Sequence, residues 1–308
     1  MVRIHAYPPY YNYLPNNYCF YLINMGKIYS WERIENDGVP NVENFSVAKR
    51  MILSDLSGLI PNEIYGAKVY GSVAKNSPSI RSDFDILVVF NNNLGVKKLN
   101  YFVQEIDKET KVQVEPLILS VQQASEGFHT IDSSFYTHFE GIPNEGNLIG
   151  NYPLNKIKPL QGNTIDVCMD YIRQKIRRLN QGHFDTSGVE LLSVLQRVLE
   201  SPVALGRKVL YVLQNLGKFE MDDKDDCKKS VIRNFNKIMV DSNIDATDFN
   251  EIVSKDKEYT EFLGETLGQK HNRSEYEQFL DVIKQETLPM AKDWIAKTEI
   301  WLKKIASS

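Results

Sequence analysis

The sequence predicts an α+β protein in which a domain of alternating strands and helices precedes an all-α domain. Two patterns lead to this prediction. Short apolar strands alternate with helical segments up to residue 119, and after Pro159 the apolar residues recur at the spacing of amphipathic helices. The chain has 308 residues, which is enough for two domains of ordinary size. We place an aromatic-rich arm at residues 1–40, the first domain at residues 41–155 and the helical domain at residues 160–308.

The first domain is expected to alternate helices and strands. Ser46 is the expected N-cap of its first helix, because apolar residues follow it at helical spacing. The strand at residues 84–90 is apolar on both faces along its later half, which is typical of a central strand. The predicted order is a helix at 46–58, a strand at 67–70, a strand at 84–90, a crossover helix at 98–109 and a strand at 112–119.

The helical domain is expected to hold several amphipathic helices, the first of them from residue 165. Ser201-Pro202 reads as an N-cap followed by proline at the first helical position. Ser274 to Glu277 has the spacing of a capping box. Pro289 is expected to break or kink the helix that follows, because proline lacks the N–H of the helical ladder. A last amphipathic helix is predicted over residues 294–305.

The N-terminal arm is crowded with aromatic side chains and interrupted by prolines, so we expect no long helix there. Its rings are Tyr7, Tyr10, Tyr11, Tyr13, Tyr18, Phe20, Tyr21, Tyr29 and Trp31. They form a stacking platform for bases or a ligand ring, or they bury area against the next domain or a second subunit. We favour burial, and the second subunit would make the protein a homodimer.

Composition and charge restrict the class of protein. The formal net charge of −4 disfavours a general nucleic-acid coat and a membrane-surface protein. The three cysteines, Cys19, Cys168 and Cys227, form neither a disulfide framework nor a CxxC zinc half-site. The sequence shows no basic stretch followed by the apolar region of a signal peptide. We therefore expect a soluble, cytoplasmic protein with no membrane partner.

The segment from residue 69 to residue 90 carries most of the chemical information. Gly71 and Ser72 directly follow a strand, and glycine lets backbone N–H groups approach a phosphate because it has no Cβ. Asp83 and Asp85 lie two residues apart at the start of the next strand, so both carboxylates project from one face. A divalent cation or a shared proton would relieve their mutual repulsion. Mg²⁺ favours this arrangement, because carboxylate and phosphate oxygens complete its octahedral coordination.

A third carboxylate lies in the next predicted strand. Val114 points to one face of that strand and Glu115 to the other. If the strand lies beside residues 84–90, Glu115 joins the two aspartates. Three carboxylates and two Mg²⁺ ions form a site that activates a hydroxyl and stabilises a leaving pyrophosphate.

These residues carry a resemblance to a known family. Gly71-Ser72, ten further residues and then Asp83-Phe84-Asp85, with a later acidic strand, resemble the polymerase β-like nucleotidyltransferase superfamily. The form Ser82-Asp83-x-Asp85 is most similar to small bacterial-type members, including aminoglycoside and minimal nucleotidyltransferases. The resemblance covers roughly residues 46–150 and implies a mixed-sheet catalytic domain. The helical half matches only as a generic companion, an all-α bundle.

The resemblance also implies roles for individual residues. Gly71 and Ser72 would hold the β- and γ-phosphates of the nucleotide, with Ser82 in the same nucleotide-binding set. Asp83 and Asp85 would bind both metal ions. Glu115 would be the third metal ligand or the general base for the acceptor hydroxyl.

Three neighbouring residues leave alternatives open. Many relatives have glycine four residues after the serine, where this chain has Asn76, and asparagine tolerates the left-handed conformation of such a turn. Lys75 and Arg81 are interpreted equally well as phosphate neighbours and as solvated surface residues.

The implied reaction is the Mg²⁺-dependent transfer of a nucleoside monophosphate from a nucleoside triphosphate, ATP as first guess, to an acceptor hydroxyl, with release of pyrophosphate. The first hypothesis for the acceptor is a small molecule such as an aminoglycoside-like antibiotic. A tRNA or a protein, as in toxin–antitoxin-type transferases, is the alternative. A third hypothesis is an inactive nucleotidyltransferase-fold module that serves in binding or as an antitoxin.

Overall fold

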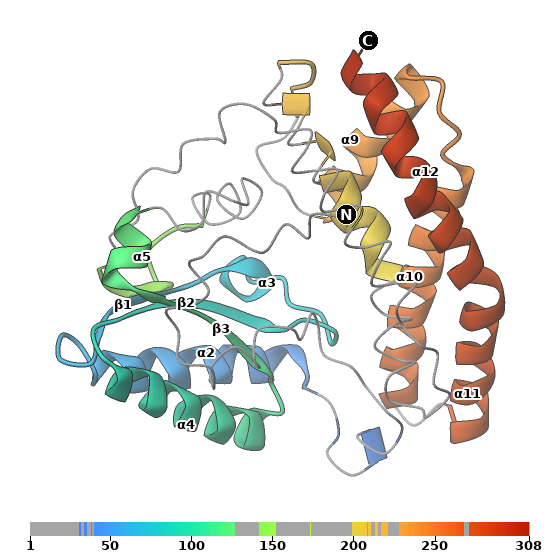
Figure 1. The fold of residues 1–308 in the computed structure, drawn as a ribbon. Helices are drawn as coiled ribbons and strands as arrows, with labels where there is room; N and C mark the ends of the chain where they lie inside the picture. The colour runs from blue at the N-terminus through green and yellow to red at the C-terminus, as the bar shows by residue number, and fades with distance from the viewer. Residues whose placement is uncertain are drawn as a thin grey trace, which may run out of the picture.

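The structure is a computed structural model that combines a four-stranded sheet with helices and continues into a helical region (Figure 1). It describes residues 31, 34–35, 38, 40–126, 142–151, 173, 199–207, 209–210, 213–214, 217–220, 228–267 and 271–307. The sheet part contains α2 (Val42–Ser57), β1 (Ile64–Val69), α3 (Gly71–Ala74), β2 (Phe84–Phe90), α4 (Asn93–Thr110), β3 (Val114–Ser120), α5 (Val121–Glu126) and β4 (Leu148–Gly150). The helical region contains α9 (Lys228–Asp241), α10 (Thr247–Leu267), α11 (Arg273–Val282), a π-helical turn (Ile283–Thr287) and α12 (Leu288–Ser307).

The sheet is mixed, and its strands follow the order β3-β2-β1-β4. β1 pairs antiparallel with both β2 and β4, whereas β2 and β3 run parallel. α4 connects the two parallel strands, which need a crossover of this kind. The prediction of an α+β fold with a mixed sheet is confirmed, and β2 has the predicted bounds and the predicted interior position.

Helices cover the sheet on both faces. Figure 1 shows α2 and α4 side by side beneath the sheet and α5 above it. Ile86 and Val88 of β2 join the apolar core under α2 and α4, whereas Leu87 and Val89 belong to a smaller cluster on the α5 face. Because β2 is buried on both sides, its sequence is a nearly continuous apolar run.

The helices of the sheet part begin earlier than the sequence patterns predict. The N-cap of α2 is Asn41, not Ser46: Asn41 Oδ1 accepts from the N–H of Asn44, and Asn44 Oδ1 accepts from the N–H of Asn41. An asparagine thus takes the place of the usual glutamate or glutamine in the capping box. α4 begins after the N-cap Asn92 rather than at residue 98, because the Asn92 side chain accepts from two N–H groups of the first turn.

The helical region has an apolar core of its own. Phe235, Phe249 and Trp294 form its centre, with ring centroids 5.0–6.2 Å apart. Of the N-terminal arm, Trp31 and Ile34 pack against this core, so these two side chains follow the burial interpretation. The other rings of the arm, like the helix expected from residue 165, lie outside the described residues.

One predicted helix boundary in the helical region is wrong, and a second feature lies near its predicted position. The capping box of α11 is formed by Asn272 and Glu275 rather than by Ser274 and Glu277. Near Pro289, where a break or kink was predicted, α11 ends at Val282 and a π-helical turn joins it to α12. The wider turn changes the hydrogen-bond partners at the point where proline has no N–H to donate. In the part of the chain that the structure describes, no helix has the length and apolar character needed to cross a bilayer.

Candidate active site

Two of the three candidate carboxylates lie opposite each other on neighbouring strands. In the parallel pair of β2 and β3, Asp85 is the register partner of Glu115. Register partners in a sheet point to the same face, here the face that carries Leu87 and α5. The condition that the sequence left open, β3 beside β2, is therefore met.

Asp83 completes the group from the loop just before β2. Its side chain forms a hydrogen bond with Glu115, so the three carboxyl groups lie close together. Burial, followed by the charge of Asp83 and this hydrogen bond, raises the pKa of Glu115 to about 8. Burial and the charges of Asp83 and Glu115 raise the pKa of Asp85 well above its ordinary value. Burial is the larger cause of both pKa shifts, and the negative charges of the neighbouring carboxylates add to it.

Gly71 fits against Asp85 because it has no side chain. It has a φ of +70°, in the left-handed region that favours glycine. A Cβ at this position would overlap the Asp85 carboxylate oxygen Oδ2. Tyr70, the preceding residue, donates its N–H to the Asp85 carbonyl oxygen at 3.1 Å. The end of β1 and the start of β2 thus bring the glycine turn directly to the carboxylates.

The turn after Gly71 is closed by backbone hydrogen bonds. The N–H of Lys75 donates to the Gly71 carbonyl at 3.3 Å, and the N–H of Ser77 donates to the Ser72 carbonyl at 2.9 Å. Asn76 has a φ of +54°, so it adopts the left-handed conformation that the sequence analysis allowed for it. The Ser72 side chain is half-buried at the start of α3. With asparagine at position 76, the turn is closed by these backbone hydrogen bonds.

Ser82 and Arg81 lie in the loop that leads to Asp83. The Ser82 hydroxyl oxygen accepts from the N–H of Ser79 at 2.9 Å and so holds the loop in a tight turn. Arg81 is only 7% exposed, and its guanidinium contacts the helical region. The interpretation of Arg81 as a solvated surface residue is therefore wrong.

Tyr70 is a neighbour of the site that the sequence analysis did not single out. Burial and the charges of Asp85, Asp83 and Glu115 raise its pKa well above the ordinary value, so the phenol stays protonated. Its place directly before Gly71 is the signal that could have identified it. Among the described residues, no group of three or more His, Cys, Asp or Glu side chains has by itself the arrangement of a metal site.

Comparison with known proteins identifies the family of this domain. Residues 50–138 match the model of the nucleotidyltransferase domain family. This part of the chain, which carries Gly71, Asp83, Asp85 and Glu115, is therefore a nucleotidyltransferase domain. The match supports nucleotidyl transfer as the general class of reaction, with a nucleoside triphosphate as substrate. No curated protein and no solved structure matches the chain.

Proposed function

We propose that the protein transfers a nucleoside monophosphate from a nucleoside triphosphate to an acceptor hydroxyl and releases pyrophosphate, in a Mg²⁺-dependent reaction. AMP, from ATP, is the first candidate for the transferred group. One observation carries the proposal. Asp85 and Glu115 are register partners on one sheet face, with Asp83 hydrogen-bonded to Glu115 and Gly71 in contact with Asp85, inside a nucleotidyltransferase domain.

The carboxylates suit Mg²⁺ in their chemistry, because they offer hard oxygen ligands and a surplus of negative charge. Asp83 and Asp85 would hold the cation, and Glu115 would be a third ligand or the general base. Mg²⁺ is commonly bound by one or two carboxylates together with substrate phosphates rather than by a cage of protein ligands alone. The cation would therefore be held jointly by these carboxylates and the triphosphate. When bound, the cation would neutralise charge on the triphosphate.

The residues around the carboxylates orient the nucleotide. Gly71 lets the backbone come close to the β- and γ-phosphates, and Ser72 offers a hydroxyl donor at the start of α3. The acceptor oxygen forms a bond to the α-phosphorus as the bond to the bridging oxygen breaks, and pyrophosphate leaves. The acceptor proton passes to Glu115 or to water. Most of the rate enhancement comes from positioning and from charge placed around the transferred group.

For the acceptor we propose a small molecule with a free hydroxyl, such as an aminoglycoside-like antibiotic. The formal net charge of −4 supports a cationic small molecule over a nucleic acid, since binding to phosphate backbones needs a basic surface. Transfer to tRNA or to a protein hydroxyl is the alternative, and the transfer assay separates the two.

The assay uses each α-labelled nucleoside triphosphate with Mg²⁺ and with separate pools of aminoglycosides, tRNA and protein. We expect label in the small-molecule pool and an equal amount of pyrophosphate. Label in tRNA or protein would overturn the acceptor proposal and keep the reaction class. The inactive binding or antitoxin module would be favoured by two results together. No pool would carry label, and the Asp83→Asn/Asp85→Asn protein would keep the biological effect of the wild type.

A further inference from the structure

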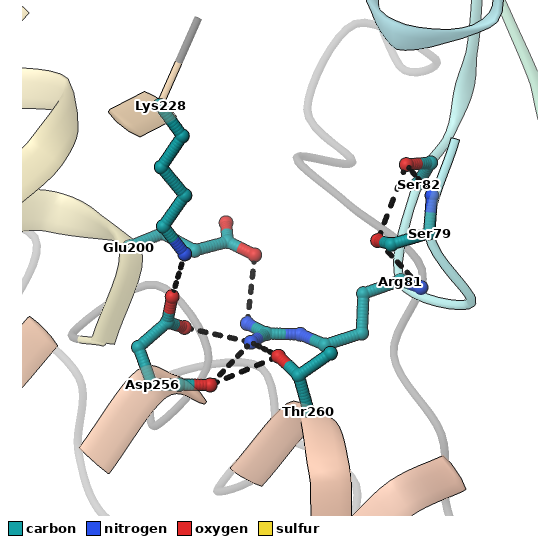
Figure 2. Close-up of polar contacts among 7 residues, drawn as sticks. All are labelled: Ser79, Arg81, Ser82, Glu200, Lys228, Asp256 and Thr260. Atoms are coloured by element: carbon teal, nitrogen blue, oxygen red, sulfur yellow. Dashed lines mark hydrogen bonds and ion pairs between the residues drawn. The ribbon is translucent and has the colours of Figure 1, made fainter. Parts of the chain in front are cut away.

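Arg81 links the loop before the candidate active site to the helical region (Figure 2). Its Nη1 lies 2.6 Å from Asp256 Oδ1 and 3.0 Å from Thr260 Oγ1, both on α10. Its Nη2 lies 2.8 Å from Glu200 Oε1, in the helical residues 199–207. One guanidinium thus donates to three side chains of a region that lies more than a hundred residues further along the chain.

The surroundings of Arg81 are balanced in charge, and the side chains of Arg81 and Asp256 are buried, whereas Glu200 and Lys228 reach the solvent. Asp256 is fully buried, and its second carboxylate oxygen accepts from Lys228 of α9. The Arg81 Cζ lies 4.9 Å from the centroid of the Tyr259 ring, within the range of a cation–π contact. Two cations therefore face the two acids, Asp256 and Glu200. A buried pair of this kind contributes little net stability, but the loss of one partner leaves the other charge unpaired.

The loop is closed by its own hydrogen bonds and packs against the helical region. The N–H of Ser79 donates to the Ser82 hydroxyl at 2.9 Å, and the N–H of Ser82 donates to the Ser79 carbonyl at 2.9 Å. Ile80 packs against the apolar core of the helical region. Because Arg81 lies two residues before Asp83, a shift of this turn shifts that aspartate. Its effect on Asp85 is smaller, since β2 already holds that residue between two strands.

From these contacts we propose that Arg81 is a positioning residue, through which α10 holds Asp83 in place for binding the cation and nucleotide. The inference rests on the proposed function for the role of Asp83. The helical region would then contribute to the reaction by positioning Asp83, in addition to any contact with the acceptor. The planar fork of arginine suits this task, because it reaches several acceptors in fixed directions, which lysine does not.

The test compares Arg81→Lys and Arg81→Ala with the control Arg273→Ala. Arg273 is also an ion-paired arginine, 2.9 Å from Glu277, but it is exposed on α11. In the Arg81 variants we expect the transfer rate to fall about 10- to 100-fold, which is the usual effect of changing a residue that orients a metal-binding side chain without touching the metal. The Mg²⁺ concentration for half-maximal rate should rise, and guanidinium added to Arg81→Ala should restore part of the rate. A role in stability alone would change the unfolding midpoint but neither the Mg²⁺ dependence nor the guanidinium response.

A second readout does not depend on activity. Hydrogen exchange of the amides at residues 79–84 should be faster in Arg81→Lys than in Arg273→Ala. If the wild type transfers no nucleotide, the proposed function fails, and exchange still decides whether Arg81 holds this loop. Folded Arg81 variants with wild-type rates, Mg²⁺ dependence and exchange would overturn the inference. If both variants fail to fold, Thr260→Val is used, because it removes one hydrogen-bond partner of the Arg81 guanidinium. It must change the transfer rate, the Mg²⁺ dependence and the exchange in the same directions, by smaller amounts.

Discussion

Asp85 and Glu115 are paired in register on the parallel strands β2 and β3, so their carboxyl groups share one face of the sheet. They lie far apart in sequence, at positions 85 and 115, and the crossover through α4 brings them together. The hydrogen bond between Glu115 and Asp83 then adds a third carboxyl group. The fold therefore concentrates negative charge at one place, which costs stability unless a proton or a cation offsets it.

This charge predicts how stability depends on pH. The pKa of Glu115 rises from 4.5 to about 8 in the folded protein, first because of burial and then because of Asp83. The folded state then holds the proton more tightly than the unfolded chain. In the absence of Mg²⁺ and nucleotide, this contribution is fully present below pH 4.5 and is lost as the pH rises to about 8.

Urea denaturation across that pH range, without divalent cations, measures this trend. Glu115→Gln serves as the comparison, because it keeps the shape of the side chain and does not titrate. We expect its free energy of unfolding to fall less with pH than that of the wild type. Equal slopes for the two proteins would mean that Glu115 does not carry the raised pKa.

Gly71→Ala should remove nucleotide binding by displacing Asp85. The change introduces a Cβ that overlaps the Asp85 carboxylate and also strains a backbone with a φ of +70°. Gly217→Ala is the matched control, since Gly217 has a φ of +67° and open space where its Cβ would lie. Both variants should lose about 1–2 kcal/mol of folding stability from backbone strain. Calorimetric titration with Mg²⁺ and ATP should show a loss of binding for Gly71→Ala alone, and equal affinities in the two variants would contradict the role of Gly71.

Position 76, in the turn that follows Gly71, should accept glycine in place of its asparagine. Asn76 has a φ of +54° and is exposed, so its side chain matters little for packing. Asn76→Gly should keep the transfer rate, whereas Asn76→Ala should lose about 1 kcal/mol of stability, because alanine is strained in this conformation. Thermal unfolding and the transfer assay test the pair. A gain in rate of tenfold or more for Asn76→Gly would show that the asparagine impairs the enzyme.

The candidate site could be predicted from the sequence because its residues lie in a short segment with strong local signals. Residues 84–90 form a nearly continuous apolar run, which is typical of a central strand, and this places Asp85 at the start of β2. The opposite faces of Val114 and Glu115 followed from strand alternation, so only the neighbour of that strand had to be assumed.

The contacts of Arg81 could not be predicted in the same way. Its partners Glu200 and Asp256 lie 119 and 175 residues away in the sequence, and no local pattern connects them. The start of α2 differs from the prediction because serine and asparagine are similarly good N-caps, and Asn41 gains a reciprocal partner in Asn44. Such choices depend on which of several similar side chains finds a partner in the folded chain.

The most direct test of the account is titration of ATP, CTP, GTP and UTP into the protein with and without Mg²⁺. The same titrations are made with Asp83→Asn/Asp85→Asn and with Asp241→Asn/Asp281→Asn, which changes two exposed aspartates of the helical region. We predict Mg²⁺-dependent binding of at least one nucleotide, kept by the control and weakened at least about 10-fold in the site variant. No binding of any nucleotide by the wild type, or equal binding by all three proteins, would contradict a nucleotide site at these carboxylates.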